Sequence, residues 1–264
     1  MSLVKSLRRM FHRPAKPRNR SHHRKARHFL EILEDRTLLS VYTVDRLSDT
    51  GAGSGLTGDL RYCITHATSG QDTIQFSVNG TINLTGALPD LTRSVSIQGP
   101  GADRLMVRRN SGGDYRIFTT VLNTTISISG LTVANGRVTS ANGGGILNQG
   151  TLTVSNSTVS GNTALGDYCS TGGNGGGILN QGTLTVSNST LSSNSASCSY
   201  GGGHVGGGIN NTGTLTVSNS TLSGNSSDSG ISNSGNLTIT NSTISGNAPL
   251  FPAVPLAGFP MTER

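Results

Sequence analysis

A segment of twenty residues recurs four times in the second half of the chain. Its first copy, GGGILNQGTLTVSNSTVSGN, occupies residues 143–162, and it returns with few changes at 175–194, 206–225 and 228–247. Successive copies begin 32, 31 and 22 residues apart. Self-similarity at such a period is the signature of a solenoid. The shortest spacing sets a structural unit of about 22 residues, and the longer spacings contain insertions.

Each copy alternates apolar and polar residues, as in TLTVS at 151–155. This period of two puts alternate side chains on opposite faces of a β-strand. Ile146 and Val159 mark two further short strands, and the Gly and Asn residues between strands tolerate the positive φ angles of sharp corners. Three strands and three corners predict an all-β fold, a right-handed single-stranded parallel β-helix of about eight coils at residues 41–248.

One such coil is not stable alone. Burial of its four aliphatic side chains contributes roughly 6 to 12 kcal/mol, whereas ordering 22 backbone units costs roughly 20 kcal/mol or more. Stacked coils share backbone hydrogen bonds and bury one another's apolar rows. We therefore expect Leu152, Leu184 and Leu215 to point inward in a single stack.

Asparagine recurs at three fixed positions of every copy. Equivalent side-chain amides that stack in register can hydrogen-bond from one coil to the next. We therefore predict three structural ladders. They comprise Asn148, Asn180, Asn211 and Asn233; Asn156, Asn188, Asn219 and Asn241; and Asn162, Asn194, Asn225 and Asn247.

The composition and the charge distribution exclude several classes of protein. With 37 Gly, no Trp and 4% aromatic residues, the chain is no conventional helix-packed globule. The net charge is +7, but ten of the twenty Lys and Arg residues lie between Lys5 and Arg27. The chain beyond residue 30 holds ten basic and thirteen acidic residues, a formal charge of −3. We therefore expect no nucleic-acid partner.

The three cysteines form neither a disulfide framework nor a common zinc motif. Cys169 and Cys198 fall in successive insertions, beside Tyr168 and Tyr200, so stacked repeats would bring them together. A disulfide and two free thiols both remain open. We expect no cofactor and no metal site.

Residues 1–40 are a basic leader whose first part lacks periodicity, and we expect it to be disordered. It ends in LEILEDRTLLS, residues 30–40, which resembles the LExLEDRxLLS motif near the N-termini of planctomycete surface and exported proteins. This resemblance implies an exported, extracellular or cell-surface protein. Residues 249–264 contain four prolines, which stop strand pairing, and we expect a tail or a cap without a transmembrane segment.

A second resemblance concerns the β-helix itself. Residues 42–247 follow the segment order of β-helix proteins with a CSLREAI motif: GTINLTG, SIQGPGAD, SISGLTV and then GGGI repeats. The motif itself is degenerate, because GDLRYCITHA has Tyr62 and Cys63 where the family has Glu and Ala. The repeats are also similar to those of bacterial polymorphic outer-membrane adhesins. Both resemblances imply the fold and a surface location, without any functional residue.

Catalytic residues are scarce in the regular coils. Between residues 118 and 247 the acids are Asp167 and Asp228, and the one Lys or Arg is Arg137. A carbohydrate-active site needs clustered carboxylates or paired acids. The earlier coils hold more charge, which we interpret as a scattered surface with a small cleft as the alternative. These residues are Asp45, Asp49, Asp59, Arg61, His66, Asp72, Asp90, Asp103, Arg108, Arg109 and Asp114.

These patterns lead to two hypotheses for function. The first is a secreted or cell-surface structural or adhesive scaffold, in which the outer face and the insertion loops at 163–174 and 195–205 contact polysaccharide or another surface protein. The alternative is a carbohydrate-active enzyme, a polysaccharide lyase or hydrolase, that uses the charged early coils. The sequence predicts no oligomeric state.

Overall fold

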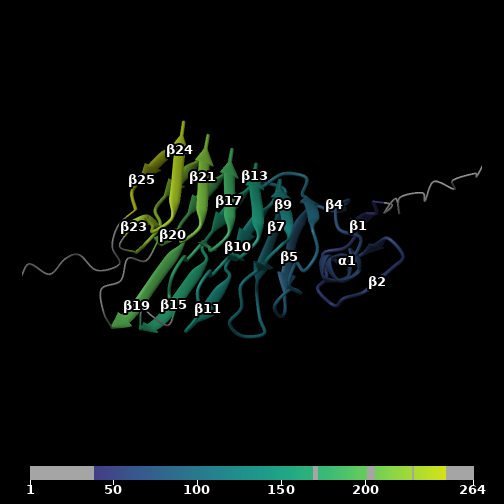
Figure 1. Cartoon of the computed structure of the whole chain (residues 1–264). Helices are drawn as coiled ribbons and strands as arrows, with labels where there is room; N and C mark the ends of the chain where they lie inside the picture. The colour runs from purple at the N-terminus through teal and green to yellow at the C-terminus, as the bar shows by residue number, and fades with distance from the viewer. Residues whose placement is uncertain (1–38, 169–171, 201–205, 228, 248–264) are drawn as a thin grey trace, which may run out of the picture. The chain divides into compact units, whose positions relative to one another are not determined.

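The computed structural model of the chain describes residues 39–168, 172–200, 206–227 and 229–247. All of them belong to one compact unit, Thr37–Arg264. Their strands wind in successive coils and pair in parallel with the strands of neighbouring coils (Figure 1). The fold is therefore the all-β parallel β-helix that the repeats predict. The predicted leader up to residue 38, and the predicted tail, lie outside the described residues.

The first face of the β-helix is a ten-stranded sheet, in which two short strands at one edge precede eight strands that come one from each coil. All neighbours among these coil strands pair in parallel. In order they are β1 (Val41–Val44), β4 (Asp72–Phe76), β6 (Val95–Gln98), β9 (Thr125–Ser129), β13 (Thr151–Ser155), β17 (Thr183–Ser187), β21 (Thr214–Ser218) and β24 (Asn236–Thr240). These eight successive strands confirm the predicted number of coils.

Two further sheets complete a three-sided coil. The seven-stranded sheet contains, in order, β25 (Thr243–Ser245), β22 (Thr221–Ser223), β18 (Thr190–Ser192), β14 (Thr158–Ser160), β10 (Thr132–Ala134), β7 (Leu105–Arg109) and β5 (Gly80–Leu84). The five-stranded sheet contains β23 (Ser229–Asn233), β20 (Gly206–Asn211), β16 (Ile178–Asn180), β12 (Ile146–Asn148) and β8 (Phe118–Thr120).

The insertions begin as strands, so the prediction of loops there is wrong for their first residues. A three-stranded sheet joins β11 (Arg137–Thr139), β15 (Thr163–Tyr168) and β19 (Ser195–Tyr200). Ala164 pairs with Ala196, and their exposed fractions are 0% and 1%. The inward residues here are small, and the apolar alternation that marks the other strands is therefore weak in the sequence.

A helix that the all-β prediction did not include covers the N-terminal end. The degenerate motif forms α1 (Leu60–His66), preceded by the short antiparallel strands β2 (Gly53–Ser54) and β3 (Thr57–Gly58). Leu60, Cys63 and Ile64 are buried in the same apolar cluster as the first coils. The first coil has no preceding coil among the described residues, and α1 therefore covers its apolar interior.

The interior is filled by aliphatic rows, as predicted. Leu152 pairs with Leu184, which pairs with Leu215, and all three are at most 1% exposed. The row continues to Leu237 in the last coil, which is 37% exposed because no coil lies beyond it among the described residues.

Two of the three predicted asparagine ladders are present. The Nδ2 atom of Asn148 donates to Oδ1 of Asn180 at 2.7 Å, and the same bond repeats at 2.6 Å to Asn211 and from there to Asn233. A second buried ladder has the same donor and acceptor atoms, at 2.9 to 3.0 Å. Its members are Asn162, Asn194, Asn225 and Asn247.

The third predicted ladder is wrong. Its asparagines are exposed, and at φ angles of +46° to +49° they occupy left-handed corners. These are Asn156, Asn188, Asn219 and Asn241. Among the described residues their side chains make no hydrogen bond to one another. The next residue along the chain forms the contact between coils instead. The backbone N–H of Ser157 donates to Oγ of Ser189, and that of Ser189 to Oγ of Ser220.

Candidate functional site

Asp59, a candidate from the sequence, is fully buried at the start of α1. One carboxylate oxygen accepts the backbone N–H of Tyr62 at 2.9 Å, as a helix N-cap does. The other accepts the N–H groups of Thr50 and Ala52 at 2.8 and 3.1 Å. Asp59 therefore fixes the preceding loop to the helix, and its hydrogen bonds assign it a structural role.

A second buried carboxylate connects α1 to the second coil. Asp49 forms a bidentate pair with Arg61, both distances being 2.9 Å, and its side chain is 1% exposed. Asp49 also accepts the N–H of Thr85 at 2.7 Å. The guanidinium of Arg61 donates further to the carbonyl oxygens of Gly86 and Ala87. The charges of Asp49 and Arg61 are therefore used in hydrogen bonds that join α1 to the segment after β5.

Asp72 is the third buried acid, at the start of β4. Its carboxylate accepts the N–H of Ser40 at 2.8 Å and both the N–H and the hydroxyl of Ser69 at 3.0 Å. Burial opposes ionisation, but the hydrogen bonds from Ser69 and Ser40 outweigh it and lower the pKa of Asp72. The ionised Asp72 carboxylate therefore fixes the segments of Ser40 and Ser69 to the start of β4.

Other charged candidates of the early coils are on the surface. Asp45 forms an exposed pair with Arg46, whose hydrogen bond lowers the pKa of the Asp45 carboxyl. The ring of His66 stacks on Tyr62 with 3.9 Å between centroids. Asp103 is exposed. The structure does not bring these side chains together with the buried acids in one cleft.

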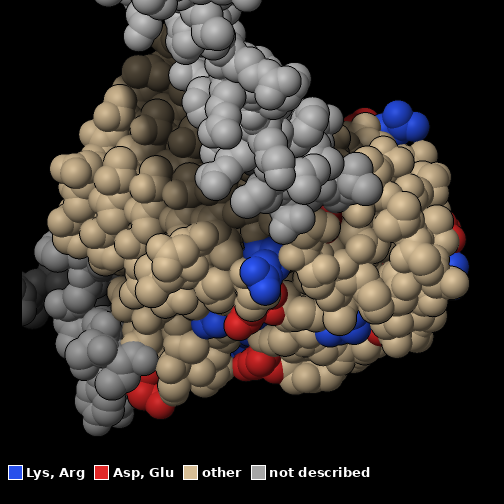
Figure 2. All heavy atoms as spheres, turned by 45° about the vertical axis from the view of Figure 1, so that its right-hand side comes forward, with Lys and Arg blue, Asp and Glu red and all other residues tan. Residues whose placement is uncertain are grey.

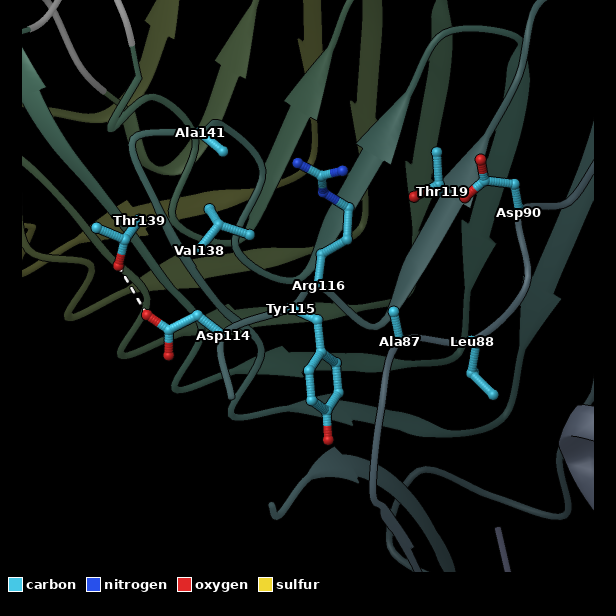
Figure 3. A pocket seen from close by; sticks show the side chains of 10 residues that line it. All are labelled: Ala87, Leu88, Asp90, Asp114, Tyr115, Arg116, Thr119, Val138, Thr139 and Ala141. Carbon is cyan, nitrogen blue, oxygen red and sulfur yellow. Dashed lines mark hydrogen bonds between the residues drawn. The ribbon is translucent and has the colours of Figure 1, made fainter. Parts of the chain in front are cut away.

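Arg116, just before β8, lines a cavity of about 330 Å³ (Figure 3). The Arg116 guanidinium donates to the carbonyl oxygens of Asn142 and Gly143, at 2.9 and 3.3 Å. Burial lowers the pKa of Arg116, against the opposing effect of the Asp90 charge. Figure 3 shows Asp90 and Asp114 on opposite sides of the arginine.

The two carboxylates of this cavity are not a convergent pair. Asp114 points away from Arg116 and accepts the hydroxyl of Thr139 at 2.7 Å, and it lies 3.3 Å from Nε of Arg137 (Figure 3). A glycosidase needs two acids that face one bond. Arg116 has no signal in the sequence, because it belongs to no motif and its contacts come from residues 26 and 27 positions along the chain.

A larger hollow of about 650 Å³ lies on the face formed by β16, β20 and β23. Its lining is mostly amide and hydroxyl side chains, with Leu179 and Ile231 as apolar patches. At its rim, Oδ1 of Asn142 accepts both the N–H and the Nδ2 of Asn174, at 2.9 and 3.0 Å. Its exposed Gln181 accepts Nε2 of Gln149 at 3.2 Å. Such side chains offer donors and acceptors that suit sugar hydroxyls.

The sequence contained a signal for this hollow. Gln149 and Gln181 occupy the same place in two copies, directly after a ladder asparagine. The alternation of a strand puts the residue after an inward side chain outward. Thr212 and Ser234 hold this place in the other two copies, so repetition predicts an outward row of amide and hydroxyl side chains.

The cysteines are divided between described and undescribed parts of the chain. Cys63 is buried and free, and burial raises the pKa of its thiol to about 12. Cys198 lies in β19, where its backbone is opposite Gly166. Cys169 lies outside the described residues, as does Asp228, so the pairing of Cys169 with Cys198 stays a prediction.

Charged side chains are few on the face shown in Figure 2, where most blue and red atoms lie in the lower middle, others lie at the upper right and right edge, and most of the surface is uncharged. Within the described ranges, no group of three or more His, Cys, Asp or Glu side chains is placed to hold a metal ion. The same residues include no helix that is long and apolar enough to cross a membrane.

Comparison of the chain with protein-family models gives no match. Comparisons with curated proteins and with solved structures likewise give no significant match. The resemblances to CSLREAI-type, planctomycete and polymorphic outer-membrane proteins therefore stay predictions from the sequence.

Proposed function

We propose that this protein is a secreted or cell-surface scaffold whose outer faces bind polysaccharide. The observation that carries the proposal is the amide-lined hollow on β16, β20 and β23. Rows of Asn, Gln, Ser and Thr recur there at the spacing of the coils, about 4.8 Å. A regular polar surface of this kind suits an extended, repetitive ligand. The structural use of Asp49, Asp59 and Asp72 supports a binding role over catalysis.

The test is a binding screen of the full chain against immobilised polysaccharides, run beside reducing-sugar and lyase assays on the same panel. We expect retention without turnover. Gln181→Ala, in the hollow, should weaken binding, whereas Gln98→Ala, an exposed glutamine on the first face, should not. Equal losses in both variants, or no binding by the parent chain, would reject the hollow as the binding surface.

The surface location rests on the resemblance of LEILEDRTLLS to the planctomycete motif. Immunolabelling of intact cells of the source organism tests it. We expect labelling without permeabilisation, and labelling that requires permeabilisation would contradict the proposal.

One observation favours the enzyme alternative. Arg116 lines one cavity together with Asp90 and Asp114, which places a cation and two acids around a single hollow. A lyase would release unsaturated sugars, and Arg116→Lys and Asp90→Asn would abolish that release. Turnover that depends on these residues would replace the scaffold proposal with the enzyme.

A further inference from the structure

A third hollow, of about 340 Å³, lies where β7 ends and β11 and β15 begin. Three arginines line it, namely Arg108, Arg109 and Arg137. The first two end β7 and the third begins β11, in the next coil. The rest of the lining is small or polar, and none of it is acidic. The fold thus gathers three cations that are up to 29 positions apart in the sequence.

The positive charge in this hollow is mostly uncompensated. Nε of Arg108 donates to the side-chain oxygen of Asn83 at 2.7 Å, and Arg109 donates to the carbonyl oxygens of Asn135 and Gly113. These acceptors are neutral. Arg137 alone of the three has an acidic partner among the described residues, Asp114, at 3.3 Å. The three guanidinium groups therefore have one carboxylate partner between them.

Several N–H donors of these arginines remain for a ligand. No Nη atom of Arg108 or Arg137, and only one of Arg109, takes part in a hydrogen bond within the described part of the chain. The guanidinium group presents paired N–H donors that match the two oxygens of a carboxylate or a sulfate. An anion in the hollow would be held by charge and by geometry.

We propose that the hollow of Arg108, Arg109 and Arg137 binds the carboxylate or sulfate groups of an acidic polysaccharide. This inference rests on the proposed function and names the ligand class. The arginines come from adjacent coils about 4.8 Å apart, so they can engage anionic groups on successive sugar units. A nucleic acid fits less well, because no aromatic side chain lines the hollow for base stacking.

The experiment compares full-chain variants. Arg108→Gln with Arg137→Gln removes two charges from the hollow, and Arg93→Gln with Arg104→Gln removes two exposed charges elsewhere. Each is titrated with polygalacturonate, dextran sulfate, carboxyl-reduced polygalacturonate and duplex DNA. Because the ten Lys and Arg residues of the leader are common to all variants, the difference between variants isolates the hollow.

We expect the hollow variant to bind one of the two acidic polymers about tenfold more weakly or worse, which is a loss of about 1.4 kcal/mol or more, since it lacks two donors of charge-assisted hydrogen bonds. The control variant should stay within about twofold. The polymer whose binding changes identifies carboxylate or sulfate as the ligand group. Thermal unfolding of both variants verifies that they fold.

A site-resolved measurement accompanies the titration. Bound ligand should protect Arg108 and Arg137 from phenylglyoxal, as read by mass spectrometry, and leave Arg93 reactive. Equal weakening in both variants, no protection, or an equal effect on DNA would overturn the proposal. Neutral-glycan binding that depends on Gln181 but not on the arginines would overturn this inference and leave the proposed function standing.

Discussion

The first coils and the regular coils of this β-helix are held together by different chemistry. In the first coils, buried carboxylates accept backbone N–H groups from loops and from α1, as Asp49, Asp59 and Asp72 do. In the regular coils, neutral amides bond to their own copies in neighbouring coils. Asn148 and Asn194 are as fully buried as the acids.

The difference follows from the presence or absence of identical neighbours. In a coil with a copy on each side, a corner amide donates a hydrogen bond to the equivalent amide of one neighbour and accepts one from that of the other. This works because donor and acceptor atoms recur at the same place in every coil. An end coil lacks one of these partners. At the end coil, irregular loops present several backbone N–H groups at one place. A carboxylate has two acceptor atoms and bonds to more of these N–H groups than an amide, which has one.

The largest effect should come from Asn194→Ala. The Asn194 side chain accepts both the N–H and the Nδ2 of Asn162 and donates to the Val159 carbonyl and to Asn225. Its loss leaves several buried groups without partners. We expect the free energy of unfolding to fall by about 3–5 kcal/mol, measured by urea denaturation. A loss below about 1 kcal/mol would show that the ladder is not a major source of stability.

A smaller, local effect is expected at the other end of the molecule. Asp59→Ala removes the N-cap of α1 and the bonds to Thr50 and Ala52. Because this loop can open to water while the coils stay folded, we expect the free energy of local opening of α1 to fall by about 2–3 kcal/mol. The measurement is thiol labelling of Cys63, which is buried with a pKa of about 12, in a chain with Cys169 and Cys198 replaced by serine.

The control for that measurement is Asp103→Ala, at an exposed position of the same region. Cys63 should label quickly in the Asp59 variant and slowly in the control, with little change in global unfolding. Labelling that follows global unfolding in both variants would mean that α1 does not open separately.

A third effect appears only in acid. The folded-state pKa of Asp72 is lowered, so its hydrogen bonds stabilise the fold above the unfolded pKa of about 3.9 and are lost as the pH falls through the folded pKa. Thermal unfolding measured from about pH 5 downward should show a steep loss in the parent chain. In the Asp72→Asn variant the unfolding temperature should fall less steeply with decreasing pH, and in Ser69→Ala the dependence on pH should be intermediate. An unchanged slope in Asp72→Asn would contradict the assignment.

The smallest effect should come from the asparagines that form no ladder. Asn188 is exposed at a φ of +48°. Asn188→Ala should cost about 1 kcal/mol through left-handed strain, and Asn188→Gly less than about 0.5 kcal/mol. Urea denaturation of the pair beside Asn194→Ala gives the comparison. A cost for Asn188→Gly as large as that of Asn194→Ala would restore the third ladder.

Much of the fold was accessible from the sequence because its signal is local and repeated. The alternation in TLTVS gives the inward row of Leu152 and Val154, and both are 0% exposed. The same alternation, with small residues, was too weak to reveal β15 and β19. The candidate sites were less accessible, since Arg116 and the hollow of Arg108, Arg109 and Arg137 depend on which coils lie next to each other.

Local sequence patterns specify the coil, its strands, the inward aliphatic rows and two of the amide ladders, because a period of two and a repeated unit fix which positions coincide after stacking. The three-dimensional arrangement settles which side chain at each corner turns inward, so that the serine hydroxyls, as at Ser189, rather than side chains such as that of Asn156, bond between coils. It also decided the role of α1 and the clustering of the arginines. These depend on contacts between coils and at an end that has no repeat, where no local pattern specifies the partner.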